Sequence, residues 1–155
     1  MTEPHPNRQP FSPERPLVVG TDHRSSSMRL RDRLHIDEAA RQGFFERLRR
    51  SGLSQALILS FADRIDVLAL AQDCARAAPE ITSIMADHAG ASAAEIGQQT
   101  YVKTDAEALR HLFAVTAAVD GLVVGDQRVR DLVAEAHGLA REAGMSGAEL
   151  DAMCE

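Results

Sequence analysis

Four short apolar segments, separated by longer stretches with helical periodicity, limit what this chain can fold into. The apolar segments span residues 17–20, 56–59, 64–70 and 101–103, and their lengths are typical of buried strands. A turn at Ala62 and Asp63 separates the second segment from the third, which favours a β-hairpin. Helical stretches follow the first and third strands, so the order of elements is βαββαβ and then further helices. This order predicts an α+β fold, a ferredoxin-like βαββαβ sandwich with a C-terminal helical extension.

The helical stretches carry their own start and stop signals. Asp37 is the expected N-cap of a helix that Gly52 ends. Three pairs of residues with capping spacing predict further helix starts: Ser92 with Glu95, Thr104 with Glu107, and Ser146 with Glu149. Other helical stretches cover residues 72–88 and about 126–142. The periodicity predicts that Phe113 and Leu132 lie on buried helix faces.

Length and composition agree with one soluble domain. The chain has 155 residues, of which 45% are apolar and 26% charged, and this excludes a wholly disordered, collagen-like or membrane-embedded chain. We expect residues 1–15 to form a flexible proline-rich arm and residues 16–155 a single domain, with the sandwich in 16–103 and helices in 104–155. No segment has the pattern of a signal peptide or a membrane span, so we expect a cytoplasmic protein without a membrane partner.

The spacing of cysteines and histidines predicts no metal site. Cys74 and Cys154 are far apart in sequence and form no C-x-x-C motif. The six histidines show no clustered spacing. We therefore expect two reduced thiols and no bound metal.

Four segments of the chain resemble, in the same order, segments of the glutamyl-tRNA reductase family. Residues 18–25 read V-V-G-T-D-H-R-S and residues 31–34 read R-D-R-L, similar to V-V-G-L-N-H-K/R-T and R-E-x-L. Residues 56–67, A-L-I-L-S-F-A-D-R-I-D-V, are similar to A-V-I-L-S-T-C-N-R-T-E-V. Residues 111–115 and 119–126, H-L-F-A-V and V-D-G-L-V-V-G-D, resemble H-L-F-R-V and L-D-S-M-V-L-G-E. Residues 136–144, A-H-G-L-A-R-E-A-G, resemble A-Y-x-x-A-R-E-A-G, so the resemblance is to the family's N-terminal catalytic domain.

The resemblance implies a reaction that needs a cysteine, and this chain has no cysteine at the matching position. Members of the family reduce glutamyl-tRNA to glutamate-1-semialdehyde: a cysteine attacks the glutamyl ester, and NADPH bound to a second domain reduces the thioester. Ala62 occupies the position of that cysteine, and alanine cannot form a covalent intermediate. No G-x-G-x-x-G follows a strand, and the chain ends where the NADPH domain would begin. We therefore expect no NADPH and no reductase activity.

Other positions of the family pattern are partly kept. Replaced positions are Phe61 for threonine, Asp63 for asparagine, Gly121 for serine, and Arg128 and Leu132 for glutamines. Kept or conservatively changed positions are His23, Ser25, Arg64, Asp120 and Asp126, and Arg64 matches the arginine that holds the substrate carboxylate. The resulting candidate ligand-binding residues are His23, Ser25, Asp63, Arg64, Asp126 and Arg128.

Several of these residues have two interpretations. Arg64 could clamp a carboxylate or form a structural salt bridge with Asp63 or Asp66. His23 and His88 are candidate axial ligands for haem, since histidine is the usual ligand type, or they are ordinary histidines. His111 is interpreted as structural. The arginines between residues 24 and 50 could contact tRNA phosphates or form a solvated face.

Three functions are compatible with this pattern. The first is a non-catalytic module that binds haem or another tetrapyrrole and acts in or near tetrapyrrole metabolism. The second is an interaction adaptor for tRNA or for a reductase partner. The third is an enzyme with new chemistry in the old pocket, using acid–base groups such as Asp63 and Asp126. We rank the functions in this order.

Overall fold

A computed structural model describes residues 13–119 and 124–155. Expectations for most of the arm and for Asp120 and Gly121 fall outside these residues. The described part contains four strands and seven helices. In chain order they are β1 Arg15–Asp22, α1 Met28–Leu34, α2 Glu38–Arg50, β2 Ala56–Phe61, β3 Arg64–Ala71, α3 Cys74–Ala89, α4 Ala93–Gln99, β4 Tyr101–Thr104, α5 Asp105–Thr116, α6 Arg128–Glu142 and α7 Ala148–Cys154.

The four strands form one antiparallel sheet in the order β2-β3-β1-β4. This is the strand order of a ferredoxin-like sandwich, so the predicted fold is confirmed. Phe61 pairs with Arg64, which leaves Ala62 and Asp63 as the two-residue turn of the hairpin. Asp22 also pairs with Arg64, so the last residue of β1 lies at the same end of the sheet as this turn.

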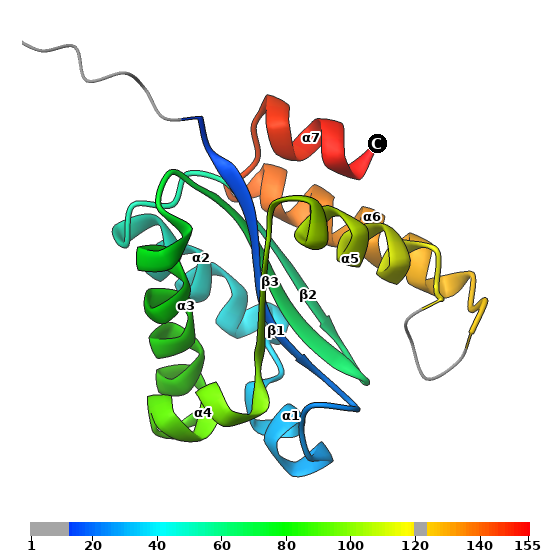
Figure 1. The fold of residues 1–155 in the computed structure, drawn as a ribbon. Coiled ribbons are helices and arrows are strands. Elements are labelled where there is room, and N and C mark those ends of the chain that lie inside the picture. Colours follow the sequence, from blue (N-terminus) through cyan, green and yellow to red (C-terminus); the bar gives the residue numbers. More distant parts are fainter. Residues whose placement is uncertain (1–12, 120–123) are drawn as a thin grey trace, which may run out of the picture.

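Helices cover both faces of the sheet. Helices α2 and α3 lie on one side, and α5 and α6 lie on the other (Figure 1). As a result, all eight residues of β3 are buried, including Arg64 and Asp66. The C-terminal helical extension thus closes the face that a minimal βαββαβ sandwich leaves open to solvent. In the part of the chain that the structure describes, no helix is both long and apolar enough to cross a membrane.

Local signals located three helix starts correctly, at Asp37, Ser92 and Thr104, and missed the start of α1. The side chains of Asp37 and Ser92 accept hydrogen bonds from the backbone of Ala40 and Glu95, as predicted. Thr104 is the N-cap of α5, so the predicted helix start is confirmed, but its side chain makes no capping hydrogen bond. The reason is geometric: Asp105 has a φ of 54°, so the chain turns sharply as it enters α5. Helix α1 was not predicted, although Ser27 caps it in the same way.

Two predicted core positions are wrong. Phe113 is 55% exposed and Leu132 is 40% exposed. Helix α5 instead buries Ala108, His111, Leu112 and Val115, a face with the spacing i, i+3, i+4 and i+7. The hydrogen bond of His111 to Asp66 on β3 favours this rotation of α5, which turns Phe113 toward solvent.

Helix α7 is capped from a distance. Its N-cap is Gly147, not Ser146, and Gly147 offers no side chain. The buried side chain of Gln55, just before β2, accepts hydrogen bonds from the backbone of Gly147 and Leu150 at 3.0 and 3.1 Å. The Gln55 amide nitrogen donates to Glu149 at 2.9 Å. Gln55 therefore supplies the cap that the local sequence lacks.

Replacing Gln55 with alanine should increase local unfolding of α7 more than local unfolding elsewhere in the fold. The Gln55→Ala variant leaves the N–H of the buried Leu150 and that of the partly buried Gly147 without an acceptor, which costs about 1–3 kcal/mol. In hydrogen-exchange measurements, α7 amides should exchange roughly tenfold faster or more. Gln98→Ala, a change of the same kind at an exposed site in α4, is the control and should leave α7 unaffected. Equal exchange in both variants would contradict the role assigned to Gln55.

Candidate functional site

Ala62, which the resemblance places at the position of the family's cysteine, lies on the β2–β3 turn. Ala62 is exposed there, with the half-exposed Asp63 beside it. The loop that follows β1 lies at the same end of the sheet, because Asp22 pairs with Arg64. The structure thus places the predicted residues His23, Ser25, Asp63 and Arg64 on two adjacent segments.

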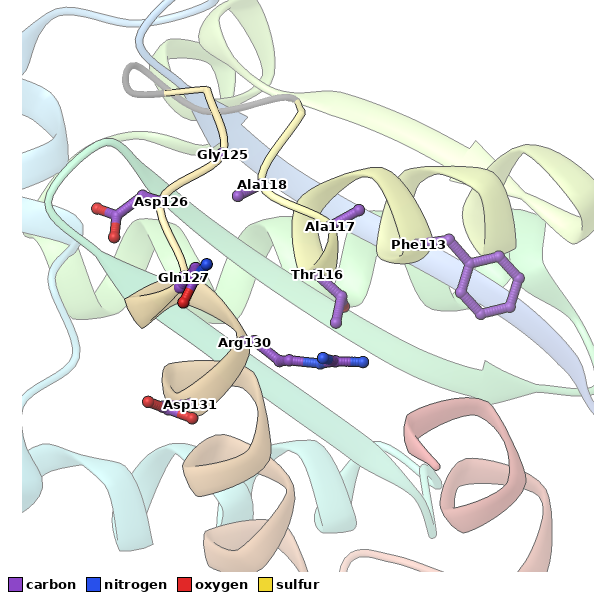
Figure 2. Close-up of a pocket in the computed structure, with 9 residues that line it drawn as sticks. All are labelled: Phe113, Thr116, Ala117, Ala118, Gly125, Asp126, Gln127, Arg130 and Asp131. Atoms are coloured by element: carbon purple, nitrogen blue, oxygen red, sulfur yellow. The ribbon is translucent and has the colours of Figure 1, made fainter.

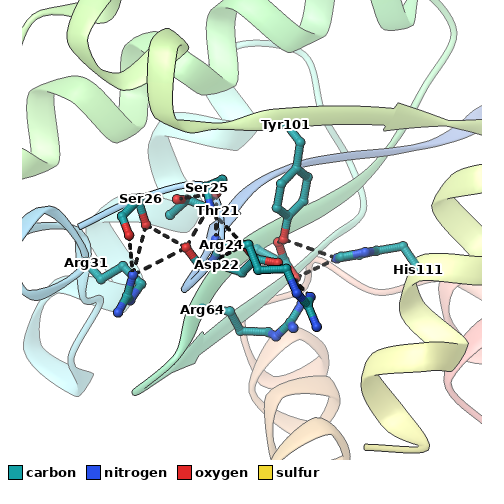
Figure 3. A network of polar contacts seen from close by, with 10 residues as sticks. Thr21, Asp22, Arg24, Ser25, Ser26, Arg31, Arg64, Tyr101 and His111 are labelled. Atoms are coloured by element: carbon teal, nitrogen blue, oxygen red, sulfur yellow. Dashed lines mark hydrogen bonds and ion pairs between the residues drawn. The ribbon is translucent and has the colours of Figure 1, made fainter. Parts of the chain in front are cut away.

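Behind the turn, the buried carboxylate of Asp66 accepts hydrogen bonds from Arg64, His111 and Tyr101. These four residues form the buried cluster. The Nη1 of Arg64 donates to Oδ2 of Asp66 at 3.2 Å, and Nε2 of His111 donates to the same oxygen at 2.8 Å. The hydroxyl of Tyr101 donates to Oδ1 of Asp66 (Figure 3). Arg64 and Asp66 are each 1% exposed. Burial and the neighbouring Asp66 charge raise the pKa of Tyr101 far above its usual range, so its hydroxyl stays a donor.

The absence of a side chain at Gly20 leaves the space that the buried cluster occupies. Gly20 on β1 lies between its partners Asp66 on β3 and Tyr101 on β4. A Cβ atom on Gly20 would lie 1.8 Å from Oδ1 of Asp66 and 2.9 Å from the carbonyl oxygen of Ile65. The Asp66 carboxylate therefore occupies the space above Gly20 and reaches Tyr101 across the middle strand.

These contacts distinguish between the two interpretations of Arg64, binding of a ligand carboxylate and a structural salt bridge. The structure brings Arg64 to Asp66, as the salt-bridge alternative expected. The Arg64 side chain is only 2% exposed. A carboxylate ligand would thus have to displace Asp66 and open the cluster to reach the guanidinium. The geometry favours a structural role for Arg64.

The loop after β1 is fixed by its own hydrogen bonds. Oδ1 of Asp22 accepts from the backbone N–H groups of Arg24 and Ser25 at 2.9 and 3.0 Å. The hydroxyl of Thr21 donates to the carbonyl oxygen of Gln99 at 2.7 Å. The buried Arg31 donates to the carbonyl oxygen of Ser26 at 2.7 Å (Figure 3). Ser25 belongs to this internal network and bonds to Thr21 and to the Asp22 backbone.

The two candidate haem histidines differ in the contacts of their ring nitrogens. Nδ1 of His23 is buried and has no hydrogen-bond partner among the described residues. Ligation through Nε2 would put a proton on that buried, unpaired Nδ1, whereas ligating histidines normally donate this proton to an acceptor. In His88, Nε2 donates to the carbonyl oxygen of His35 at 2.9 Å, and the ring packs edge-on against Phe44. His23 therefore does not fit a haem iron, and His88 would have to ligate through Nδ1 with its ring held against Phe44.

Asp126 and Arg128 bind each other where the segment between α5 and α6 meets α6. Nη2 of Arg128 donates to Oδ2 of Asp126 at 2.8 Å, and these bonds hold the pKa of Asp126 below its usual value. Asp126 lines a cavity of about 620 Å³ between the end of α5 and the start of α6 (Figure 2). Neither Asp63 nor Arg64 lines this cavity. The residues named for new acid–base chemistry are therefore not gathered around it.

Both thiols lie at the far end of the sheet from Ala62. Sγ of Cys74 lies 3.9 Å from the carbonyl oxygen of Arg15, the first residue of β1. The turn adjoins the last residue of β1, and eight strand residues span about 23 Å. Cys154 is in α7, which lies at the end of the sheet opposite the turn (Figure 1). Burial raises the pKa of Cys74 and raises that of Cys154 to about 11, so both thiols favour the protonated form.

Many arginines of the N-terminal half are engaged within the protein. Arg31 is buried, and Arg33 donates to the carbonyl oxygens of Ala89 and Gly90 at 3.1 and 2.9 Å. Arg47 pairs with Asp87, and Arg49 with Glu46. These contacts are typical of a charged surface with internal ion pairs, and phosphate binding stays a prediction. In the described ranges, no group of three or more His, Cys, Asp or Glu side chains is placed to hold a metal ion.

Sequence reasoning named Asp66 only as a possible salt-bridge partner of Arg64 and did not identify Tyr101 as a member of this site. An acidic residue inside the apolar strand 64–70 was the available signal for Asp66, since a buried carboxylate needs donors nearby. Tyr101 gave no local signal. Its role depends on strand register, which brings Gly20, Asp66 and Tyr101 onto one line across three strands.

Known proteins that are similar to this chain are glutamyl-tRNA reductases. A glutamyl-tRNA reductase of Rubrobacter xylanophilus is 32% identical over 135 residues, which cover 86% of this chain and 31% of the relative. One of Syntrophus aciditrophicus is 33% identical over 134 residues, with 84% and 32% covered. The chain thus spans about a third of the length of these relatives. The solved glutamyl-tRNA reductase from Methanopyrus kandleri shares the fold, with a TM-score of 0.71 and 21% identity over 90% of this chain and 31% of that one.

The family assignment follows from the extent of the match. The family model that describes the N-terminal domain of glutamyl-tRNA(Glu) reductase matches residues 19–155, which is nearly the whole described fold. The match includes the β1 loop, the β2–β3 turn and the buried cluster behind it. The chain belongs to the family of glutamyl-tRNA reductase N-terminal domains.

Proposed function

We propose that this chain is a non-catalytic member of its family that acts as a binding module in tetrapyrrole metabolism. The observation that carries the proposal is Ala62 on the exposed β2–β3 turn, where the resemblance implies a nucleophilic cysteine. Without a thiol at this position, a glutamyl group cannot be transferred to the protein there. Neither Cys74 nor Cys154 can replace it, because both lie at the opposite end of the sheet.

The buried cluster behind the turn supports retention of the binding surface. Asp66 ties β3 to α5 and β4 through Arg64, His111 and Tyr101. Asp22 and Arg31 hold the loop after β1 beside the turn. The surface around Ala62 therefore keeps a defined shape although the nucleophile is gone, and this favours binding over loss of the site.

A reductase assay tests the proposal. The purified chain, incubated with glutamyl-tRNA and NADPH, should give no glutamate-1-semialdehyde above the level without protein. The Cys74→Ser and Cys154→Ser variants are controls and should behave like the natural chain. Semialdehyde formation that disappears in either variant would overturn the proposal, since it would identify a working thiol.

A haem titration tests the tetrapyrrole alternative. Because Nδ1 of His23 is buried and unpaired, and the His88 ring is held by His35 and Phe44, we expect no histidine-dependent Soret band. Spectra of the natural chain should match those of His23→Ala and His88→Ala, with His5→Ala as a control outside the described residues. A sharp Soret shift that is lost in one of the first two variants would show that haem is the ligand and that the histidine rearranges.

A further inference from the structure

The outer edge of β2 carries unused backbone groups. β2 is at one end of the sheet, and in an antiparallel strand the backbone groups of alternate residues point toward the neighbour and away from it. Gln55 and Leu70 are bonded across to each other, whereas the N–H of Ala56 donates outward to Met145 at 2.9 Å. By this alternation, the backbones of Ile58 and Ser60 also point outward. Among the described residues outside the strand, none forms a backbone–backbone hydrogen bond with either of them, and the Ser60 side chain accepts from the N–H of Ile36 at 2.9 Å.

A groove lies over this edge. A cavity of about 150 Å³ is lined by Ile58 and Ser60, by Arg41 of α2, and by Leu132, Glu135 and Leu139 of α6. It adjoins a second cavity of about 380 Å³, which shares Arg41 and Leu139 and continues between the two helices. The groove therefore offers both strand edge and apolar wall. This also accounts for Leu132, which is 40% exposed on a helix that otherwise buries its apolar face.

The charged residues that line the groove favour a positively charged occupant. Four glutamates and one arginine line the two cavities, a net charge of −3: Glu38 and Glu46 on α2, Glu135 and Glu142 on α6, and Arg41. Only Glu46 has an ion-pair partner among the described residues, which is Arg49. A segment that carries lysine or arginine beside its apolar residues would complement this rim.

We infer that the β2 edge is a strand-addition site for an extended, basic–apolar segment of a partner protein. The segment would pair its backbone with Ile58 and Ser60, as Met145 already does with Ala56. Its apolar side chains would contact Leu132 and Leu139, and its basic side chains would face Glu135 and Glu142. The chain's own first twelve residues suit the edge poorly, because Pro4, Pro6 and Pro10 have no N–H to donate. This inference does not depend on the loss of the nucleophile.

Peptide binding to the full chain tests the inference. The probe is a fluorescent peptide of about seven residues that alternates valine with lysine and threonine. Its control has the same sequence with N-methyl groups on alternate backbone nitrogens, which removes strand hydrogen bonds. In anisotropy measurements the methylated peptide should bind roughly tenfold more weakly or worse. On the protein side, Glu135→Lys should weaken binding roughly tenfold, whereas Glu107→Lys, the same charge change on α5, should leave it nearly unchanged.

Amide exchange locates the contact. In NMR measurements on the full chain, the amides of Ile58 and Ser60 should exchange fast without peptide and slowly with it, while those of Leu57 and Leu59 stay protected throughout. Equal binding of the methylated peptide, or equal effects of Glu135→Lys and Glu107→Lys, would overturn the inference. So would protection of Ile58 and Ser60 in the free chain, since the chain would then cover this edge itself.

Discussion

Replacing Asp66 with alanine should cost about 3–5 kcal/mol of unfolding free energy, the usual effect of removing one partner of a buried ion pair. The change takes the carboxylate away from a guanidinium that is almost wholly buried, and from the donors of Tyr101 and His111. For a chain of this length the melting temperature should fall by roughly 10 °C or more. Denaturant unfolding followed by circular dichroism measures the effect directly.

The control for Asp66 is another aspartate–arginine pair in the same molecule. Asp105 pairs with Arg15 at 2.6 Å, but both side chains are about half exposed. Removing this pair with Asp105→Asn should cost much less than Asp66→Ala, because solvent screens the charges. Asparagine also tolerates the positive φ of this position. Equal losses in the two variants would contradict the structural role given to the buried cluster.

A methyl group on Gly20 should have an effect of similar size. Gly20→Ala places its Cβ against the Asp66 carboxylate and the Ile65 carbonyl, so either the cluster or the strand pairing must move. We expect a loss of about 3 kcal/mol or more. Gly43→Ala is the matched control: nothing lies within 4 Å of the added atom in α2, so this variant should be stabilised by about 0.5–1 kcal/mol.

If Gly20→Ala fails to fold, a double-mutant cycle with Asp66→Ala still tests the predicted clash between the added Cβ and the Asp66 carboxylate. In an Asp66→Ala background the closest clash is gone, so adding Gly20→Ala should cost less than it does in the natural chain. The coupling between the two changes should be at least about 1 kcal/mol. Strict additivity would mean that the Asp66 carboxylate does not occupy the space above Gly20.

The sequence predicted those parts of the fold that depend on neighbouring residues. The caps at Asp37 and Ser92 depend on groups three residues apart, and the hairpin turn on two residues, so both were predictable. The capping hydrogen bond of Thr104 is missing because strand β4 and helix α5 meet at a strained Asp105, which no spacing rule describes. The strand order followed from the βαββαβ pattern.

The site was less predictable because it depends on register and helix rotation. Arg64 was identified from its motif, but its burial against Asp66 requires helices over both faces of β3. The line from Asp66 across Gly20 to Tyr101 joins residues up to 81 positions apart, and only strand pairing brings them together. Asp126 and Arg128 matched family positions, yet they pair with each other at the start of α6.

The most direct measurement of the central claim is the mass of the intact protein after incubation with glutamyl-tRNA. We predict that the mass stays unchanged, because Ala62 offers no nucleophile and both thiols lie at the far end of the sheet. A hydroxylamine-sensitive adduct of one glutamyl group, absent from the Cys74→Ser or the Cys154→Ser variant, would contradict it.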